Sequence, residues 1–524
     1  MKYANKETRM QAAHNTKQTR RLLFALVLIL AFLSGCQAVR ELAPAVESSN
    51  NGQVDEVAAT PQAQPTLAPQ PTTPPGLPTP APSPTLALLS GSPSLGDPFT
   101  PDLGNTGYDV QSYHLQLAID PLQSRIEGTT TLQAVTTIPN LRQISLDFIG
   151  LEISALAVDG QPAEYRRNEG KLWVEYPQPL LVEGTPFTVA VTYAGTPLQV
   201  DSPYIHYADY LGLIFPGGNT FYTLSEPDGA RYWFPSNDHP RDRATYRIEL
   251  TVPRGLAAVS NGQLVESMLS AMPDGSDAAT FVWEHDAPMA SYLALAAGGH
   301  YLRVDDESPN GVPLVYYYFP ELEEEFLEAT EITGEAIDWL SDLIGPYPYD
   351  SYGQATYYAL GISMEMQTMT LLSFQMLNER TVVHEMAHSW FGNWVALDTW
   401  GDTWLKEGIA TYMEVLWLSR NDPSRRAALI TEIEEEVAER GQDYPLNQPP
   451  RERILSFDSY NRGALMIHAL YQEMGDEAFF QGLRTYVARY GGQSVGQAAF
   501  EEVMEEAAGR NLDELWHAWL ANRP

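Results

Sequence analysis

His384 and His388 are four residues apart in the segment VVHEMAH, with Glu385 next to the first of them. If this segment is helical, the two histidines lie one turn apart on one face, with Cβ atoms about 5 to 6 Å apart. Both imidazoles can then bind one metal ion at distances of about 2.1 Å. Glu385 falls beside the open coordination position, where its carboxylate can accept a proton from an attacking water molecule. The spacing therefore predicts a metal site with an adjacent general base.

A third ligand follows in the next segment of helical periodicity. Residues 389–406 separate His388 from Glu407, which lies within WLKEGIATYME. Two histidines and one carboxylate leave the fourth tetrahedral position for water, an arrangement typical of a catalytic zinc ion. The chain contains a single cysteine, which is too few for a thiolate-rich metal site. We therefore expect one Zn²⁺ ion, bound by His384, His388 and Glu407.

The alternative is that these residues have ordinary structural roles. The two histidines would then be hydrogen-bonded core residues, and Glu407 would be an exposed carboxylate. The segment around the histidines is apolar on nearly every side, so burying two histidines and a glutamate there without a cation would be costly. This cost favours the metal site. Asp402 could be the N-cap of the second helix or could orient a metal ligand, and we favour the N-cap.

The elements that must position these residues change character along the chain. From about Tyr108 to Leu302, segments such as YHLQLAID and FTVAVTY alternate with period two and are separated by Gly, Pro, Asn and Asp, which predicts antiparallel sheets. Beyond residue 320, most segments have helical length and periodicity. One β-rich passage, residues 353–373, predicts a small sheet beside these helices. The predicted helical segments are 321–345, 380–395, 403–419, 460–474 and the segment from Asp476 to the C-terminus.

The first 35 residues have the layout of a secretory signal. Six basic residues precede an apolar run from Leu22 to Leu33, and this last leucine begins the sequence LSGC. The run is too short to span a bilayer comfortably, so a transmembrane anchor is the less favoured alternative. LSGC resembles the lipobox of bacterial lipoproteins, which implies that Cys36 becomes a lipid-carrying N-terminus. We therefore expect an exported lipoprotein on the outer side of the bacterial cytoplasmic membrane or at the cell surface.

A segment rich in Pro, Thr, Ala, Ser and Gln follows the signal. It cannot bury enough apolar surface to offset its ordering entropy, so we interpret it as a disordered linker. The predicted organisation is a signal with lipobox (1–35), a linker (36–103), an N-terminal β domain (104–305) and a mostly helical zinc domain (306–524).

The charge balance excludes one class of partner. The chain has 31 Lys and Arg against 67 Asp and Glu, a formal net charge of −36. Binding of nucleic acid requires a basic stripe, and none is present in the sequence. We therefore expect no nucleic acid partner.

Taken together, these motifs resemble the zinc aminopeptidase family of aminopeptidase N and leukotriene A4 hydrolase, the gluzincin type of metallopeptidase. The segments HEMAHSWFGNWV and WGDTWLKEGIATYMEVLW carry the resemblance, which covers about residue 105 to the end. It implies an α+β multidomain fold, in which a saddle-like, antiparallel N-terminal β domain precedes a thermolysin-like catalytic domain that is mostly α-helical with a small β-sheet. It also implies hydrolysis of N-terminal residues from peptides, with Glu385 as the general base.

The resemblance assigns three further residues. LSEPDGARYWFPSNDHP is similar to a family segment that maps an amine-binding residue onto Glu226. ISMEMQT resembles the family motif Gly-x-Met-Glu-Asn and maps a second amine-binding carboxylate onto Glu365. YNRGALMIHAL resembles a Tyr-x-Lys-Gly segment, which implies that Tyr460 stabilises the oxyanion. Ile362 and Met366 stand where the family motif has Gly and Asn, so the contacts near the first substrate residue are expected to differ.

The expected partners are peptides with free N-termini and, through the lipid, a membrane. Two other functions are compatible with the sequence. One is a zinc-containing surface lipoprotein that binds peptides without cleaving them, and the other is a broader hydrolase, since one branch of the family also opens an epoxide. The presence of Glu385, the three ligands and Tyr460 favours the enzyme over the binding protein.

Lipidation of Cys36 can be tested on the mature protein. Mass spectrometry is expected to show a chain that begins at Cys36 and carries acyl groups, because cleavage at a lipobox precedes this cysteine. Cys36→Ser is expected to shift the protein out of the membrane fraction. An intact precursor with an unmodified Cys36 would contradict the prediction.

Overall fold

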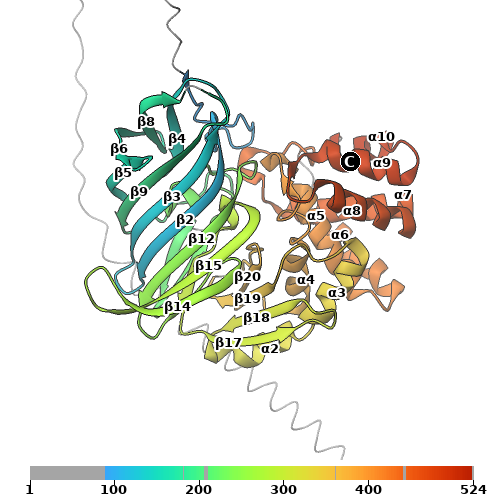
Figure 1. Cartoon of the computed structure of the whole chain (residues 1–524). Coiled ribbons are helices and arrows are strands. Elements are labelled where there is room, and N and C mark those ends of the chain that lie inside the picture. Colours follow the sequence, from blue (N-terminus) through green and yellow to red (C-terminus); the bar gives the residue numbers. More distant parts are fainter. Residues whose placement is uncertain (1–88, 181, 206–209, 360, 441–443, 522–524) are drawn as a thin grey trace, which may run out of the picture. The chain divides into compact units, whose positions relative to one another are not determined.

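The computed structural model describes residues 89–180, 182–205, 210–359, 361–440 and 444–521. The predicted signal, Cys36 and most of the predicted linker lie outside these residues. Within them, strands dominate as far as Tyr318 and helices from Glu323 onward, which confirms the predicted order of a β-rich part and a helical part (Figure 1). No helix among the described residues is both long and apolar enough to span a bilayer.

An eight-stranded sheet forms the largest layer of the β-rich part (Figure 1). Buried and partly exposed residues alternate along its central strands, which is why the period-two pattern predicted them. Neighbouring strands pair antiparallel except for β2 and β12, which pair in parallel with Thr245 opposite Ser112. In order across the sheet, the strands are β14 (Gln263–Ala271), β15 (Asp277–Ala290), β12 (Arg243–Pro253), β2 (Tyr108–Asp120), β3 (Arg125–Thr136), β9 (Pro186–Gly195), β5 (Glu152–Val158) and β6 (Gln161–Pro162).

The described residues contain three four-stranded sheets as well, and two of them lie within the stretch from Leu89 to Gly299. One contains β1 (Leu89–Ser90), β4 (Leu141–Asp147), β8 (Lys171–Leu180) and β7 (Tyr165–Asn168), in that order. The other contains β10 (Gly212–Gly217), β11 (Thr220–Leu224), β16 (Ala297–Gly299) and β13 (Ala257–Val259). Strand β11 ends two residues before Glu226, so this sheet leads directly into the segment predicted to bind an amine.

Residues 89–103 are packed, although the sequence assigns them to a disordered linker. Leu103 is fully buried, and the Asp97 carboxylate accepts hydrogen bonds from the backbone N–H groups of Phe99 at 2.8 Å and Trp400 at 2.9 Å. The linker prediction is therefore wrong for these residues. A few apolar anchors and one buried carboxylate order them, and average composition does not reveal such anchors.

The predicted small sheet is present and is larger than expected. Strands β19 (Tyr352–Tyr357) and β20 (Met369–Ser373) fall within the predicted passage, and they continue a sheet begun by β17 (Leu302–Glu307) and β18 (Pro313–Tyr318). The predicted domain boundary between residues 305 and 306 falls within β17. The domain limits stay a prediction.

Helices are found in every predicted segment, but the extents differ: residues 321–345 form two helices, and the described residues from Asp476 onward form three α-helices. The segment expected to be helical over 380–395 forms a shorter helix, because the chain turns back at Gly392, whose φ of +112° suits glycine. His388 is the C-cap of this helix and keeps helical backbone angles. The helices are α2 (Glu323–Thr330), α3 (Thr333–Ile344), α4 (Glu379–Ala387), α5 (Thr403–Leu418), α6 (Pro423–Arg440), α7 (Gly463–Met474), α8 (Asp476–Tyr490), α9 (Gln497–Ala508) and α10 (Asp513–Trp516).

Helices α5 and α7 cross at two glycines. A Cβ atom added at Gly408 would lie 2.5 Å from the backbone carbon of Gly463, so the two backbones are in direct contact. This approach brings the π-helical turn η6 (Asp458–Arg462), which precedes α7, close to α5. Tyr460 in that turn thereby reaches the histidines of α4, as its stacking on His384 demonstrates.

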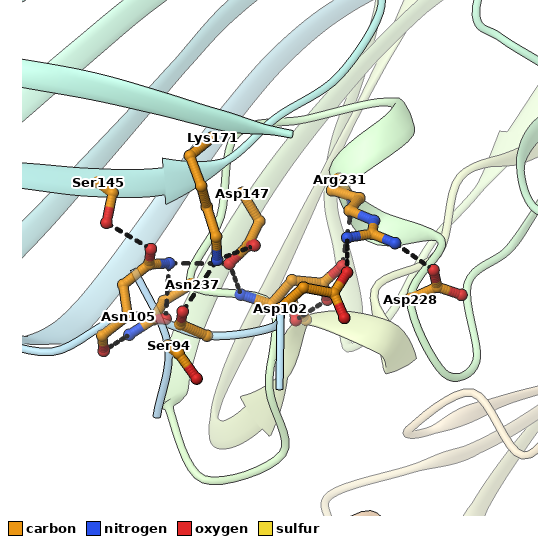
Figure 2. A network of polar contacts seen from close by, with 12 residues as sticks. Ser94, Asp102, Asn105, Ser145, Asp147, Lys171, Asp228, Arg231 and Asn237 are labelled. Atoms are coloured by element: carbon orange, nitrogen blue, oxygen red, sulfur yellow. Dashed lines mark hydrogen bonds and ion pairs between the residues drawn. The ribbon is translucent and has the colours of Figure 1, made fainter. Parts of the chain in front are cut away.

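A buried polar network fixes the segment 225–242 against the β-rich part (Figure 2). Asp147 accepts hydrogen bonds from Lys171 Nζ at 2.5 Å, from Asn105 Nδ2 at 2.8 Å and from the backbone N–H of Asp238 at 3.1 Å. Both charged side chains are almost completely buried. Breaking one partner of such a pair leaves an uncompensated buried charge, so the network strongly favours one position of the segment.

A second ion pair of this network lies within the same segment (Figure 2). The Arg231 guanidinium bonds to Asp228 and, at 3.1 Å, to Asp102. Asp228 is two residues from Glu226 and fully buried. The network therefore holds the backbone beside Glu226 in place.

Asp242, at the end of this segment, makes stability depend on pH. Burial, followed by the negative charge of Asp109, raises the pKa of Asp242 from 3.8 to about 8. In the unfolded chain this carboxyl ionises near pH 4. Between about pH 4 and pH 8 the folded protein keeps a proton that the unfolded chain loses, so the unfolding free energy falls as pH rises, by up to about 1.4 kcal/mol per pH unit. The stabilisation is complete below about pH 4 and lost above about pH 8.

We predict that Asp242→Asn weakens this pH dependence, because the amide cannot ionise and can still accept the hydrogen bond from Asn237. Thermal unfolding from pH 5 to pH 8 is the measurement, and the midpoint of the variant is expected to fall less than that of the wild type. Asp277→Asn is the control, because the Asp277 side chain is 82% exposed. Equal slopes for Asp242→Asn and the wild type would contradict the prediction.

Candidate metal centre and substrate pocket

The three predicted metal ligands meet at one point. His384 and His388 come from the C-terminal end of α4, and Glu407 comes from the second turn of α5. The two Nε2 atoms are 3.1 Å apart, and Glu407 Oε2 lies 3.3 Å from His384 Nε2 and 3.4 Å from His388 Nε2. Ligands about 2.1 Å from a tetrahedral zinc ion are separated by about 3.4 Å. The donor atoms and their spacing therefore fit Zn²⁺.

Each histidine is oriented through its other ring nitrogen. His384 Nδ1 lies 2.6 Å from Glu414 Oε1, and His388 Nδ1 lies 3.1 Å from the carbonyl oxygen of Phe391. When Nδ1 carries the proton and donates it to these acceptors, the Nε2 lone pair is left for the metal. Sequence reasoning missed Glu414. It stands two helical turns after Glu407 on α5, so the spacing of seven residues could have indicated it.

Asp402 does not contact a metal ligand. It occupies the N-cap position of α5 but makes no side-chain cap there. Its carboxylate instead accepts hydrogen bonds from Thr399, in the capping box of the preceding turn, and from the backbone N–H of Gln497 at 3.2 Å. Asp402 thus stands at the predicted N-cap position of α5, but its capping contact belongs to the preceding turn.

Glu385 lies in the same pocket as the ligands and is buried. Burial raises its pKa well above the ordinary value, although the neighbouring His384 opposes the rise. A higher pKa makes the carboxylate a stronger proton acceptor. Glu385 therefore has the position and the chemistry of a general base.

Tyr460 lines the pocket beside the first ligand. Its ring stacks on that of His384, with centroids 5.8 Å apart and planes 19° apart. The phenol thus belongs to the metal centre, where a hydrogen-bond donor can act on developing negative charge.

A buried ammonium group joins the two predicted amine-binding residues to the metal centre. Lys406 Nζ lies 2.6 Å from Glu226 Oε1, 2.5 Å from Glu365 Oε1 and 2.8 Å from Glu407 Oε1. All four side chains are at most 4% exposed. Glu226 comes from the segment fixed by the polar network, so this cluster ties the β-rich part to the ligand helix. Sequence reasoning missed Lys406, although it directly precedes a ligand.

The cluster holds more negative than positive charge. Burial alone would lower the pKa of Lys406, but the three carboxylates raise it well above its usual value, so the ammonium keeps its charge. Burial, followed by the charges of Glu365 and Glu407 and opposed by Lys406, raises the pKa of Glu226 to about 8. Glu226 is therefore the carboxyl of the cluster that takes up a proton readily, and the site favours further cations.

The two departures from the family motif have different surroundings. Ile362 lines the pocket, whereas Met366 is 1% exposed and packs in the apolar core. Asn393 is buried nearby and donates a hydrogen bond through Nδ2 to the Glu365 carbonyl oxygen at 2.7 Å. An amide side chain therefore still holds the backbone at Glu365, but it comes from the turn after α4.

Seven of the eight predicted site residues line one pocket with a volume of about 380 Å³. Cys36, the predicted lipidation site, lies outside the described residues. The pocket-lining members of the predicted site are Glu226, Glu365, His384, Glu385, His388, Glu407 and Tyr460.

Comparisons with known families agree with this geometry. The model of the peptidase family M1 domain matches residues 350–519, and that of the peptidase M1 N-terminal domain matches residues 109–293. An M1 zinc metallopeptidase from Deinococcus radiodurans has a similar structure, with 30% sequence identity and a TM-score of 0.75 over 82% of this chain and 97% of the other.

Curated relatives are similar over a shorter share of their length. The puromycin-sensitive aminopeptidase of Caenorhabditis elegans is 27% identical over 325 residues, which cover 57% of this chain and 34% of the relative. Aminopeptidase N of Streptomyces lividans is 27% identical over 333 residues, covering 57% and 38%. The matched region thus spans a little over one third of these relatives.

We predict that Glu414→Gln weakens zinc binding about 10- to 100-fold, because the amide is a poorer acceptor for the His384 N–H. Competition with a fluorescent chelator measures the change. Asp402→Asn is the matched control, since Asp402 is a similarly buried carboxylate without a ligand contact. Unchanged zinc affinity in Glu414→Gln would contradict the role of Glu414.

Proposed function

The chain belongs to the peptidase M1 family, and we propose that it is a zinc aminopeptidase that removes N-terminal residues from peptides. The observation that carries the proposal is one shared pocket, in which a zinc-type ligand set lies beside two buried glutamates, Glu226 and Glu365. The ligands suit catalysis on a carbonyl, and the glutamates suit an ammonium group.

Side chains of the pocket supply the groups that peptide hydrolysis requires. A zinc ion at His384, His388 and Glu407 would supply Lewis acidity toward the scissile carbonyl and the attacking water. Glu385 accepts the proton of that water and delivers it to the leaving amine. Tyr460 donates a hydrogen bond to the developing oxyanion, a contact typically worth about 3 kcal/mol in the transition state.

Recognition of the N-terminus rests on the cluster around Lys406. A free ammonium brought to Glu226 and Glu365 adds positive charge where carboxylates outnumber the one lysine. An acylated N-terminus brings no such charge and would leave the carboxylates undercompensated. This difference restricts cleavage to the first residue of the peptide.

The structural relatives support a peptide substrate. Related M1 zinc metallopeptidases have been crystallised with a Tyr-Ser-Ala substrate, with L-tryptophan and with L-arginine. We further propose that the protein acts outside the cytoplasm, anchored to the membrane through lipid on Cys36. The lipobox-like LSGC sequence supports this part of the proposal.

The test combines metal removal with substrate pairs that differ only at the N-terminus. The zinc-loaded protein is expected to release a fluorophore from aminoacyl substrates, to lose this activity with a chelator and to regain it with Zn²⁺. N-acetylated substrates are expected to resist cleavage. Glu385→Gln is expected to keep stoichiometric zinc while kcat falls at least about 100-fold, since it lacks the general base.

Two further results separate the alternatives. In the same assay, Glu365→Ala should lose most of the discrimination between free and acetylated substrates, whereas Glu321→Ala, an exposed carboxylate, should keep it. A wild-type protein that binds zinc and peptides but cleaves no aminoacyl substrate would instead be the binding lipoprotein.

A further inference from the structure

Arg380 differs from every other residue of the pocket. Among the described residues that line it, Arg380 is the one side chain with a permanent positive charge. Its side chain is 52% exposed, whereas the pocket carboxylates are buried. A substrate entering the pocket therefore meets a guanidinium at the mouth and carboxylates in the interior.

Arg380 lies at the end of the pocket away from the amine-binding cluster. Residues 380, 384 and 388 follow one another at four-residue spacing, so they share one face of α4, about 6 Å apart along the axis. The cluster lies beyond His388, because a Cβ atom at Gly392 would be 3.1 Å from Lys406 Cδ. Arg380 lies beyond His384, on the other side of the metal ligands.

Glu414 holds the guanidinium in a defined orientation. Arg380 Nε lies 3.3 Å from Glu414 Oε2, while the other oxygen of this carboxylate contacts His384 Nδ1 at 2.6 Å. Within the described part of the chain, Arg380 has no other ion-pair partner. Its two Nη groups can therefore serve an additional planar anion, which a guanidinium binds through two parallel N–H bonds.

We propose that Arg380 binds the C-terminal carboxylate of dipeptide and tripeptide substrates. This inference rests on the proposed aminopeptidase function and adds a substrate class to it. With the ammonium at Glu226 and Glu365 and the scissile carbonyl beside the ligands, the chain continues toward Arg380. An extended peptide spans about 3.5 Å per residue, so one or two residues beyond the scissile bond bring the carboxylate within reach of Arg380.

Binding of a substrate carboxylate also explains why Arg380 lies in a pocket that is otherwise acidic. The net charge of −36 repels a free carboxylate, and a local cation is needed to offset this repulsion. In a longer peptide, neutral amide groups pass Arg380, and the charge-assisted pair does not form. The site therefore favours short peptides with a free C-terminus over longer or amidated ones.

The experiment compares one tripeptide, Leu-Ala-Ala, as the free acid and as the C-terminal amide, using zinc-loaded protein. The wild type is expected to show the higher kcat/KM for the free acid. Arg380→Ala is expected to lower the ratio of the two kcat/KM values about 10-fold, mainly through KM, because one charge-assisted pair is lost. Arg380→Lys should retain part of the ratio, since a point charge replaces the planar fork.

Arg440→Ala is the matched control. The Arg440 guanidinium stacks on Phe457, which lines the pocket, at 3.9 Å from the ring centroid, but Arg440 does not itself line the pocket. Its removal takes away the same charge near the mouth and should leave the ratio at its wild-type value. If Arg440→Ala lowers this ratio as much as Arg380→Ala does, the effect comes from general electrostatics, and the proposal is overturned.

Two other outcomes also overturn it. If Arg380 acts only by holding Glu414 against His384, Arg380→Ala will lower activity on acid and amide by the same factor and weaken zinc binding. If the wild type itself cleaves acid and amide equally, no carboxylate is recognised, although the aminopeptidase function stands.

A wild type that cleaves neither peptide, nor any aminoacyl fluorophore, fails at the proposed function instead. Arg380→Gln replaces the alanine variant if that variant does not fold.

Discussion

Compensation of buried negative charge is the constraint on which the site depends. Glu226, Glu365 and Glu407 converge within one buried cluster, where unpaired carboxylates would be prohibitively costly. Lys406 supplies one internal positive charge at 2.5 to 2.8 Å from all three. The positive charge that is still missing can be supplied by a divalent metal ion and by the ammonium group of a substrate. The same imbalance thus favours both the metal and the N-terminus of a peptide.

The fold supplies this cluster from distant parts of the chain. Glu226 stands in a segment held by Asp147, Lys171 and the Arg231 ion pairs, far in sequence from the ligand helices (Figure 2). Helices α5 and α7 approach to backbone contact through their glycines, which brings Tyr460 to the metal centre. Packed neighbours therefore position Glu226 and Tyr460 in the pocket, as precise catalytic geometry demands.

Opposite charges also lie on opposite sides of the pocket. The carboxylate cluster lies on one side of the metal ligands, and Arg380 lies one helical turn away on the other side. A short peptide carries the opposite arrangement, with an ammonium at one end and a carboxylate at the other. Glu414 contacts both His384 and Arg380, so one side chain links metal binding to the proposed recognition of the far end of the substrate.

Local spacing in the sequence was sufficient to predict that His384, His388 and Glu407 converge, that Glu385 lies in the same pocket, and that strands precede helices, because these features depend on helical turns and alternating burial. The roles proposed for Glu226, Glu365 and Tyr460 followed only from family resemblance, since single carboxylates and tyrosines carry no local signal. Lys406 and Glu414 became visible only in the tertiary structure, as did the packing of residues 89–103. Their roles arise from contacts between segments far apart in the chain, and only packing determines which charges share a buried space.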